Sequence, residues 1–182
     1  MRRLWGCILL VLVTLVRCVA APGAEGQSGD IGRILKGFPG CHVLTLAERD
    51  SDARAFILAH FPKHNSSIVH ADFDGDGQPD YAILLRDKRS GTTKLVILLC
   101  SADMPCKSVH EVDVTSNSGG VYIRPVPMGS RVSQTDAIDT KAYPPPSRLI
   151  STGIEVTYFG QAKVVYYWNR KQKKMENVQT ED

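Results

Sequence analysis

The chain lacks the short motifs by which many enzymes are recognised. Its five histidines form no HxH or HExxH pattern, and it has no GxSxG elbow, no glycine-rich phosphate loop and no dinucleotide fingerprint. These absences exclude the enzyme classes that such motifs define. Two alternatives stay open: a secreted hydrolase using carboxylates among Glu111, Asp113 and Glu155, and a zinc site where His64 and His70 approach each other across a turn.

The chain also lacks an apolar run long enough to span a bilayer as a normal helix, and it has no internal repeat. Its longest run, Trp5–Val16, follows Arg2 and Arg3 and precedes a group of small residues. This pattern predicts a signal peptide over residues 1–20, cleaved after Ala20, because a cut one residue later would leave a proline directly behind it. An uncleaved anchor is the alternative. Cleavage predicts a secreted or periplasmic protein without a transmembrane span.

The predicted mature chain has no excess of charge of either sign. The full sequence carries 22 Lys and Arg against 19 Asp and Glu, a net charge of +3. The signal peptide removes Arg2, Arg3 and Arg17, which brings the net charge to about zero. A balanced charge argues against a general binder of nucleic acid or of anionic membranes. The one basic cluster, at 170–174, lies between two predicted strands and is typical of a solvated hairpin turn.

Cysteine is scarce, and three cysteines remain after the predicted cleavage: Cys41, Cys100 and Cys106. Export permits disulfides. Cys100 and Cys106 flank a five-residue segment that can turn back on itself, so the sequence predicts a bond between them and leaves Cys41 as a free thiol. A bond from Cys41 to either of the others is the alternative, because pairing depends on Cα geometry.

The rest of the sequence predicts an α+β fold in a single domain, 41–182, behind a flexible leader at 21–40 in which Ile34 and Leu35 begin to dock. Ala53, Phe56 and Ile57 begin a helical stripe that packs an N-terminal helix on a mainly antiparallel sheet of six to eight strands. The strands are predicted from apolar or alternating runs and the turns between them: Ser67–Phe73, Tyr81–Arg86, Lys94–Cys100, Ser108–Val114, Val121–Val126, Ile154–Phe159, Val164–Trp168 and Met175–Val178.

An acidic loop, Asp72-Phe73-Asp74-Gly75-Asp76-Gly77-Gln78-Pro79-Asp80, joins the first two of these strands. Carboxylates stand at positions 1, 3, 5 and 9, and Gly77 at position 6 permits a sharp turn. Calcium requires six to eight oxygen ligands, so the predicted ligands are Asp72, Asp74, Asp76, Asp80 and the backbone carbonyl of Gln78. Position 12 is Ile83 on a predicted strand, which rules out a helical EF-hand. An acidic turn without metal is the alternative.

The loop resembles the calcium loop of FG-GAP/VCBS-type repeats, which form the blades of integrin-like β-propellers. The resemblance covers residues 68–86 and implies the same ligands, Asp72, Asp74, Asp76, Gln78 and Asp80. It departs from that family in having one copy, whereas a propeller needs several blades. As a whole, the chain resembles small exported bacterial proteins of unknown function that combine one such loop with a C-terminal strand like Val164–Trp168 and an acidic end.

These features predict an exported, calcium-stabilised, non-catalytic module that binds a protein, a glycan or an envelope component. A candidate partner surface is the aromatic group Tyr158, Tyr166, Tyr167 and Trp168, where cross-strand packing is the structural alternative. The segment Gly129–Ile150 contains three consecutive prolines and predicts a long surface loop. That loop suggests a further alternative, an inhibitor of an extracellular enzyme.

Overall fold

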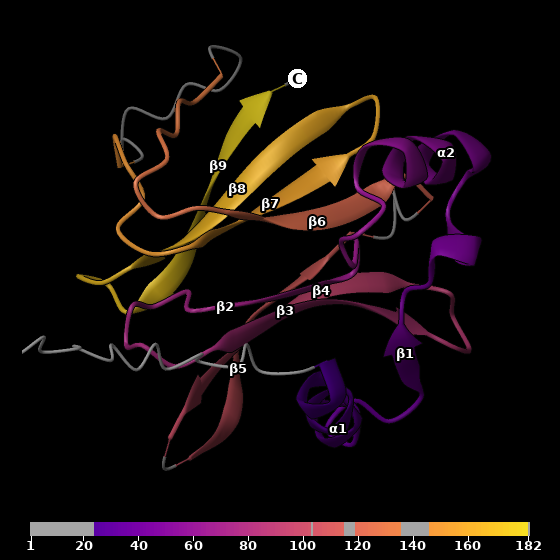
Figure 1. Ribbon diagram of the computed structural model, residues 1–182, viewed down its shortest axis with the longest axis horizontal. Coiled ribbons are helices and arrows are strands. Elements are labelled where there is room, and N and C mark those ends of the chain that lie inside the picture. The colour runs from indigo at the N-terminus through magenta and orange to yellow at the C-terminus, as the bar shows by residue number, and fades with distance from the viewer. Residues whose placement is uncertain (1–23, 103, 115–118, 136–145, 182) are drawn as a thin grey trace, which may run out of the picture.

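The computed structural model describes residues 24–102, 104–114, 119–135 and 146–181 (Figure 1). The predicted signal peptide, 1–20, lies outside the described residues. Within the described part, no helix combines the length and the apolar character needed to cross a membrane.

The described chain forms two antiparallel sheets and few helices, so the fold is mainly β (Figure 1). The sequence predicts an α+β fold with one sheet; the second sheet is the main difference. The first sheet contains β1 (Cys41–Val43), β2 (Ile68–Ala71), β3 (Asp80–Asp87), β4 (Thr93–Ser101) and β5 (Met104–Asp113). The second contains β6 (Val121–Val126), β7 (Gly153–Tyr158), β8 (Ala162–Asn169) and β9 (Lys174–Glu181). Each strand predicted from the sequence is confirmed within a few residues.

The two sheets face each other across one apolar core, as the two layers of Figure 1 show. Alternation along the strands sorts the side chains: on β3, Ala82 and Leu84 enter the core between the sheets, whereas Ile83 and Leu85 point to the outer face. The second sheet contributes residues such as Ile123 and others of β7 to β9 to the same core. A core shared in this way makes the sheets one structural unit.

The outer face of the first sheet is covered by α1 (Ala24–Leu35). Ile31, Ile34 and Leu35 pack against the outward side chains of β3 and β4, and Phe38 continues the same contact after the helix. The spacing i, i+3, i+4 places these three side chains on one face of the helix. Where the sequence predicts a flexible leader, the structure therefore has a helix, because the sheet offers an apolar surface to dock on.

The start of β6 lies against α2 (Ser51–His60), which follows a short 3₁₀ helix, Leu46–Glu48. The ring of Phe56 lies 6.2 Å from that of Tyr122 on β6 and 5.2 Å from that of Phe159. The backbone N–H of Asp50, the residue before the helix, donates to the carbonyl of Gly119. The apolar stripe of α2 therefore faces the second sheet.

Arg49 is a buried cation that joins three segments at this end of the molecule. It is 4% exposed, and its Nε donates to the carbonyl of Val121 at 2.9 Å. Its Nη1 donates to the carbonyl of Thr45 at 3.0 Å, and its Nη2 donates to the carbonyl of Ser66 at 3.0 Å and to the hydroxyl of Ser67 at 2.6 Å. Burial lowers the pKa of Arg49 to about 10, so the group stays charged at neutral pH. Neutral oxygens therefore take the place of water around this charge.

The outer face of the second sheet has its own apolar cover. Val132 and Leu149 pack there against Val165 and Tyr167 of β8. A backbone bond from Gly129 to Leu149 and a bridge between Arg131 and Arg148 join the two described ends of the predicted 129–150 loop. Residues 136–145 of that loop, with two of its three prolines, lie outside the described residues.

Candidate metal centre

The acidic loop is the connection between β2 and β3, where Ala71 pairs with Asp80. Phe73, its second residue, is fully buried in the core between the sheets. The hydroxyl of Ser151 donates to the carbonyl of Phe73 at 2.5 Å, and the N–H of Thr152 donates to the carbonyl of Asp72 at 3.3 Å. The loop, although acidic, is therefore anchored to the sandwich and also contacts the segment that leads into β7.

Backbone N–H groups inside the loop are satisfied by its own carboxylates. Asp72 accepts from Gly75 at 2.6 Å through Oδ1 and from Gly77 at 2.9 Å through Oδ2. Both glycines have positive φ, +80° and +86°, a conformation that costs other residues about 1–2 kcal/mol. This turn draws the side chains of the loop toward a common centre.

Three carboxylates meet at that centre: Asp72, Asp74 and Asp80 each offer an oxygen within 4.8 Å of the other two. Asp80 is fully buried, and its two oxygens accept the N–H of Cys100 and the N–H of Phe73, both at 2.8 Å. Burial raises the pKa of Asp80 to about 6, which the two N–H donors oppose and the neighbouring carboxylates reinforce. Burial also raises the pKa of Asp74. Ionisation of Asp80 and Asp74 is therefore less favourable here than for an ordinary carboxyl, and a bound cation would oppose that effect.

The arrangement suits calcium. Calcium binds oxygen at about 2.3–2.6 Å, so two ligands on opposite sides of one ion lie up to about 5 Å apart, which matches the spacing of the three carboxylates. Each carboxylate oxygen has more than one lone pair, so the backbone hydrogen bonds leave acceptor capacity for an ion. Magnesium demands stricter octahedral geometry and shorter distances. Three of the predicted ligands therefore have a spacing compatible with one calcium ion.

Asp76 and Gln78, the two other predicted ligands, are not part of the group of three. Both are exposed, and Asp76 Oδ1 accepts the N–H of Gln78 at 2.7 Å. The ligand assigned to Gln78 is its backbone carbonyl, which is separate from that N–H. Asp76 still contributes charge, because it is one of the groups that raise the pKa of Asp80.

A basic residue from a distant hairpin lies over this loop. Arg170, in the turn between β8 and β9, has Nη2 3.4 Å from the carbonyl of Gly75, and its charge favours ionisation of Asp74. A Cβ added at Gly75 would collide with this guanidinium. The loop thus meets the second sheet from two directions, through Arg170 and through Ser151.

A disulfide joins Cys100 and Cys106, and Cys41 is a free, half-buried cysteine. These are the same two cysteines that the sequence pairs. The bond links the end of β4 to the start of β5, where the register of the two strands shifts. The N–H of Cys100 donates to Asp80, so one residue of the disulfide is in direct contact with the buried carboxylate of the centre.

The aromatic candidates for a partner surface lie mostly inside the molecule. Tyr166 is 4% exposed in the core between the sheets, and Tyr167 is 9% exposed in the cluster on the outer face. Tyr158 and Trp168 are half-buried and pack against the core. Strand alternation sends the rings of Tyr166 and Tyr167 into two separate apolar clusters, so these two residues do not form an exposed surface in the described structure.

Two of the remaining catalytic candidates, Glu111 and Glu155, lie on different sheets. Glu155 binds Arg124 on the second sheet at 2.5 Å and 2.8 Å, whereas Glu111 binds Lys94 on the first sheet at 2.8 Å. Each of these two carboxylates is therefore engaged by a cation of its own sheet. His70 stacks on the ring of Tyr81 at 4.4 Å. Neither His64 nor His70 belongs to a group of three potential metal ligands in the described chain.

Comparison with protein-family models, with curated proteins and with solved structures gave no match to this chain.

Proposed function

We propose that this protein is an exported, non-catalytic module that calcium stabilises and that binds a protein or an envelope or extracellular component. The observation that carries the proposal is the convergence of Asp72, Asp74 and the fully buried Asp80. A buried carboxylate beside two others is costly unless a cation lies between them. The resemblance of the loop to a single copy of the FG-GAP/VCBS-type calcium loop supports the same proposal.

The position of the loop supports a structural role for the ion. Its residues contact Cys100 on the first sheet, Ser151 ahead of β7 and Arg170 beyond β8. An ion that holds the loop in place therefore also strengthens contacts between the two sheets. Extracellular calcium sites of about 10⁻⁴–10⁻³ M affinity remain occupied outside cells. The predicted signal peptide fits that compartment.

Calcium is expected to raise the melting temperature of the purified protein. At a hundredfold excess over Kd, an ion that binds only the folded state adds about 2.7 kcal/mol. For a chain of this size, that corresponds to a rise of about 5–10 °C. Calorimetric titration gives the affinity, and thermal unfolding in calcium, in magnesium and in a chelator gives the stabilisation. Identical melting curves in calcium and chelator would overturn the proposal.

The partner surface that we propose is the base of the 129–150 loop. Met128 is 69% exposed and Ile150 is 51% exposed, and the backbone bond between their neighbours, Gly129 and Leu149, brings the two segments together. Large exposed apolar patches mark interaction sites, and Met128 and Ile150 are two of the three large apolar side chains that are exposed in the described chain.

This surface predicts that a double variant, Met128→Ser with Ile150→Ser, captures less of a partner than the parent protein does. The immobilised proteins are exposed to the envelope fraction and the medium of the source organism, and bound proteins are quantified. Leu58→Ser, which removes an equally exposed side chain (53%) on α2, is the matched control. Equal capture by the parent and the double variant would exclude this surface.

A further inference from the structure

The disulfide Cys100–Cys106 lies near the end of the hairpin that β4 and β5 form, and Figure 1 shows this hairpin projecting from the two layers. The pairing of the two strands is irregular here, because their register shifts between Leu99 and Ser101. A register shift disrupts the ladder of backbone hydrogen bonds locally. The covalent bond therefore supplies a constraint on the position of Cys100 that the ladder alone supplies only in part.

The position of Cys100 matters because its backbone contacts the buried carboxylate of the metal centre. Oδ1 of Asp80 accepts the N–H of Cys100 at 2.8 Å, and Oδ2 accepts the N–H of Phe73 at 2.8 Å. One donor belongs to the acidic loop itself, and the other belongs to β4. The orientation of this carboxylate therefore depends on the hairpin that the disulfide closes.

A cavity gives access to the disulfide and to the acidic loop together. Cys100 and Cys106 both line a cavity of about 760 Å³, and Gln78 and Pro79 of the loop line it as well. Both cysteines are half-buried rather than enclosed. A small reducing agent can therefore reach the sulfur atoms beside the loop.

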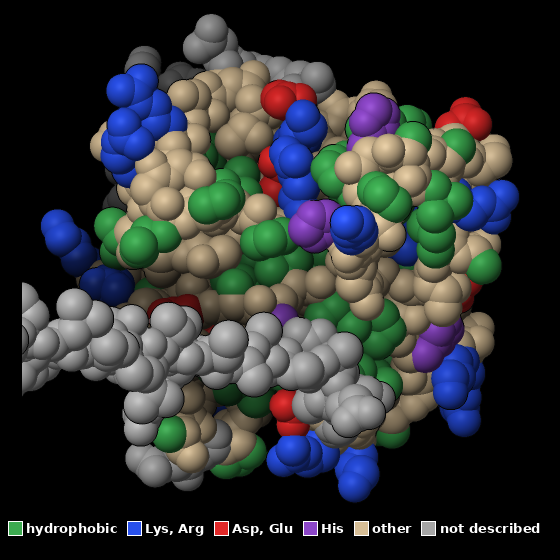
Figure 2. Space-filling model, viewed as in Figure 1, with side chains coloured by type: hydrophobic (Ala, Val, Ile, Leu, Met, Phe, Trp, Pro, Cys, Tyr) green, Lys and Arg blue, Asp and Glu red, His purple; other side chains and the backbone are tan. Residues whose placement is uncertain are grey.

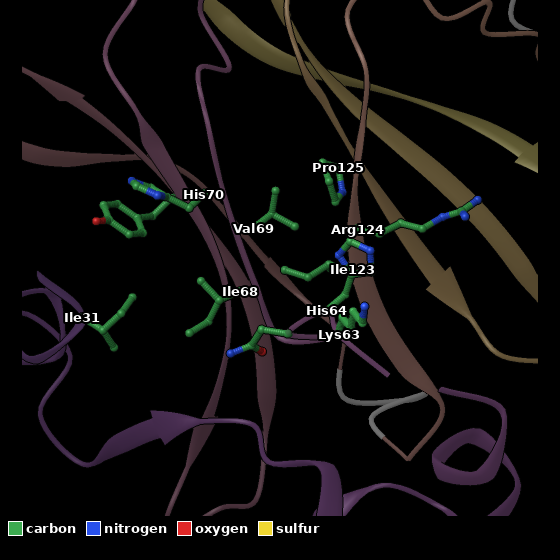
Figure 3. A pocket seen from close by; sticks show the side chains of 11 residues that line it. Ile31, Lys63, His64, Ile68, Val69, His70, Ile123, Arg124 and Pro125 are labelled. Carbon is green, nitrogen blue, oxygen red and sulfur yellow. The ribbon is translucent and has the colours of Figure 1, made fainter. Parts of the chain in front are cut away.

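A second cavity, of about 500 Å³, lies between β2 and β6, where Figure 2 shows apolar and histidine side chains between the layers. Figure 3 shows Ile68 on β2 and Ile123 and Pro125 on β6 among the residues that line it. The N–H of Ile123 donates to the carbonyl of Ser66, and Pro125, which has no N–H, cannot extend that pairing. The described lining of this cavity contains neither a loop carboxylate nor a disulfide cysteine. The second cavity is therefore separate from the metal centre.

We propose that the Cys100–Cys106 disulfide sets the calcium affinity of the acidic loop, so that its reduction weakens calcium binding. This inference rests on the proposed function, because it assigns a control to the same calcium site. Reduction by a dithiol breaks the S–S bond, transfers two electrons and two protons to the two sulfur atoms, and converts the dithiol to its own disulfide. Cys100 then moves with the irregular end of β4, and its N–H no longer holds Oδ1 of Asp80 in one place.

The first test compares the calcium affinity of the oxidised protein with that of the protein reduced by dithiothreitol, both by calorimetric titration. Loss of a hydrogen-bond partner behind a metal ligand typically lowers affinity by about 10- to 100-fold. Reduction leaves the N–H of Cys100 in the chain and removes only its constraint, so the expected loss is smaller, about three- to tenfold.

Two variants define the cause of this loss. The double variant Cys100→Ser with Cys106→Ser keeps both backbone N–H groups and similar side-chain size without the bond; it should show the weaker calcium binding without reductant and no further change with it. Cys41→Ser removes a half-buried free thiol without opening a bond, and this matched control should bind calcium as the parent protein does. Circular dichroism establishes that each variant is folded.

A second measurement uses the parent chain alone, so it holds even if the double variant does not fold. Coupling between two sites is reciprocal, so saturating calcium should lower the equilibrium constant for reduction of the disulfide by the same factor, about three- to tenfold. The protein is equilibrated in a buffer of dithiothreitol and its oxidised form, and the reduced fraction is measured by alkylation and mass spectrometry.

Hydrogen exchange separates this inference from the proposed function, because it requires no calcium. In chelator, the amide of residue 100 should exchange several-fold faster in the reduced protein than in the oxidised protein, and Cys41→Ser should leave its rate unchanged. Equal exchange rates, or equal calcium affinities of the oxidised and reduced protein, overturn the inference and leave the calcium site in place. Absence of calcium binding to the oxidised parent overturns the proposed function and the inference together.

Discussion

Replacing Arg49 by methionine is expected to lower the free energy of unfolding by about 3 kcal/mol or more. Methionine fills similar space but donates no hydrogen bond, so the carbonyls of Val121 and Ser66 lose their buried donor. Each buried acceptor left unsatisfied costs about 1–3 kcal/mol. The loss should appear in chemical denaturation as a lower midpoint with an unchanged slope.

Two further variants define the cause of the Arg49 effect. Arg49→Lys keeps the charge but concentrates its donors at one atom, which cannot reach acceptors on three separate segments; it should lose a large part of the same stability. Arg89→Met, at an exposed position in the turn between β3 and β4, should change stability by less than about 0.5 kcal/mol. If Arg49→Met is no more destabilising than Arg89→Met, the buried network does not hold these segments together.

The strands could be predicted from the sequence because their side chains follow simple periodic rules. The continuous apolar run Lys94–Cys100 predicts a central strand, and β4 has the core of the sandwich on one side and α1 on the other. The helix α1 is harder to predict, because its apolar stripe stands among glycines and small residues. The stripe indicates a helix only once the apolar outer face of the first sheet, on which the helix packs, is known.

The candidate sites also differ in how well the sequence predicts them. The acidic loop is local in sequence, so its spacing predicts the convergence of Asp72, Asp74 and Asp80. The cavity of about 500 Å³ between β2 and β6 is not local: Ile68 and Ile123, which both line it, lie far apart in the chain and come together only in the folded structure. The one signal in the sequence is Pro125, an unusual residue inside a predicted strand. The effect of this proline depends on which edge of β6 is left unpaired, and the pairing of β6 with β7 determines that edge.

Asp80 is expected to be the residue on which the calcium effect depends most. It is the buried member of the group of three, and it also accepts two backbone N–H groups. Asp80→Ala leaves those donors unsatisfied, which costs stability with or without metal. In chelator, part of this cost is offset, because the variant also removes a buried charge that the neighbouring carboxylates repel.

In saturating calcium that offset disappears, because the ion stabilises the ionised carboxylate. The cost of Asp80→Ala should therefore be larger in calcium than in chelator, by about 2.7 kcal/mol at a hundredfold excess over the Kd of the parent protein. Asp76→Ala, an exposed change outside the group of three, should produce a smaller difference. Asp52→Ala, on the exposed first turn of α2, controls for loss of a negative charge and should show no difference. An equal cost of Asp80→Ala in calcium and in chelator would show that Asp80 acts only as an acceptor for the backbone. A large calcium dependence would instead identify the buried carboxylate of Asp80 as a ligand of the ion.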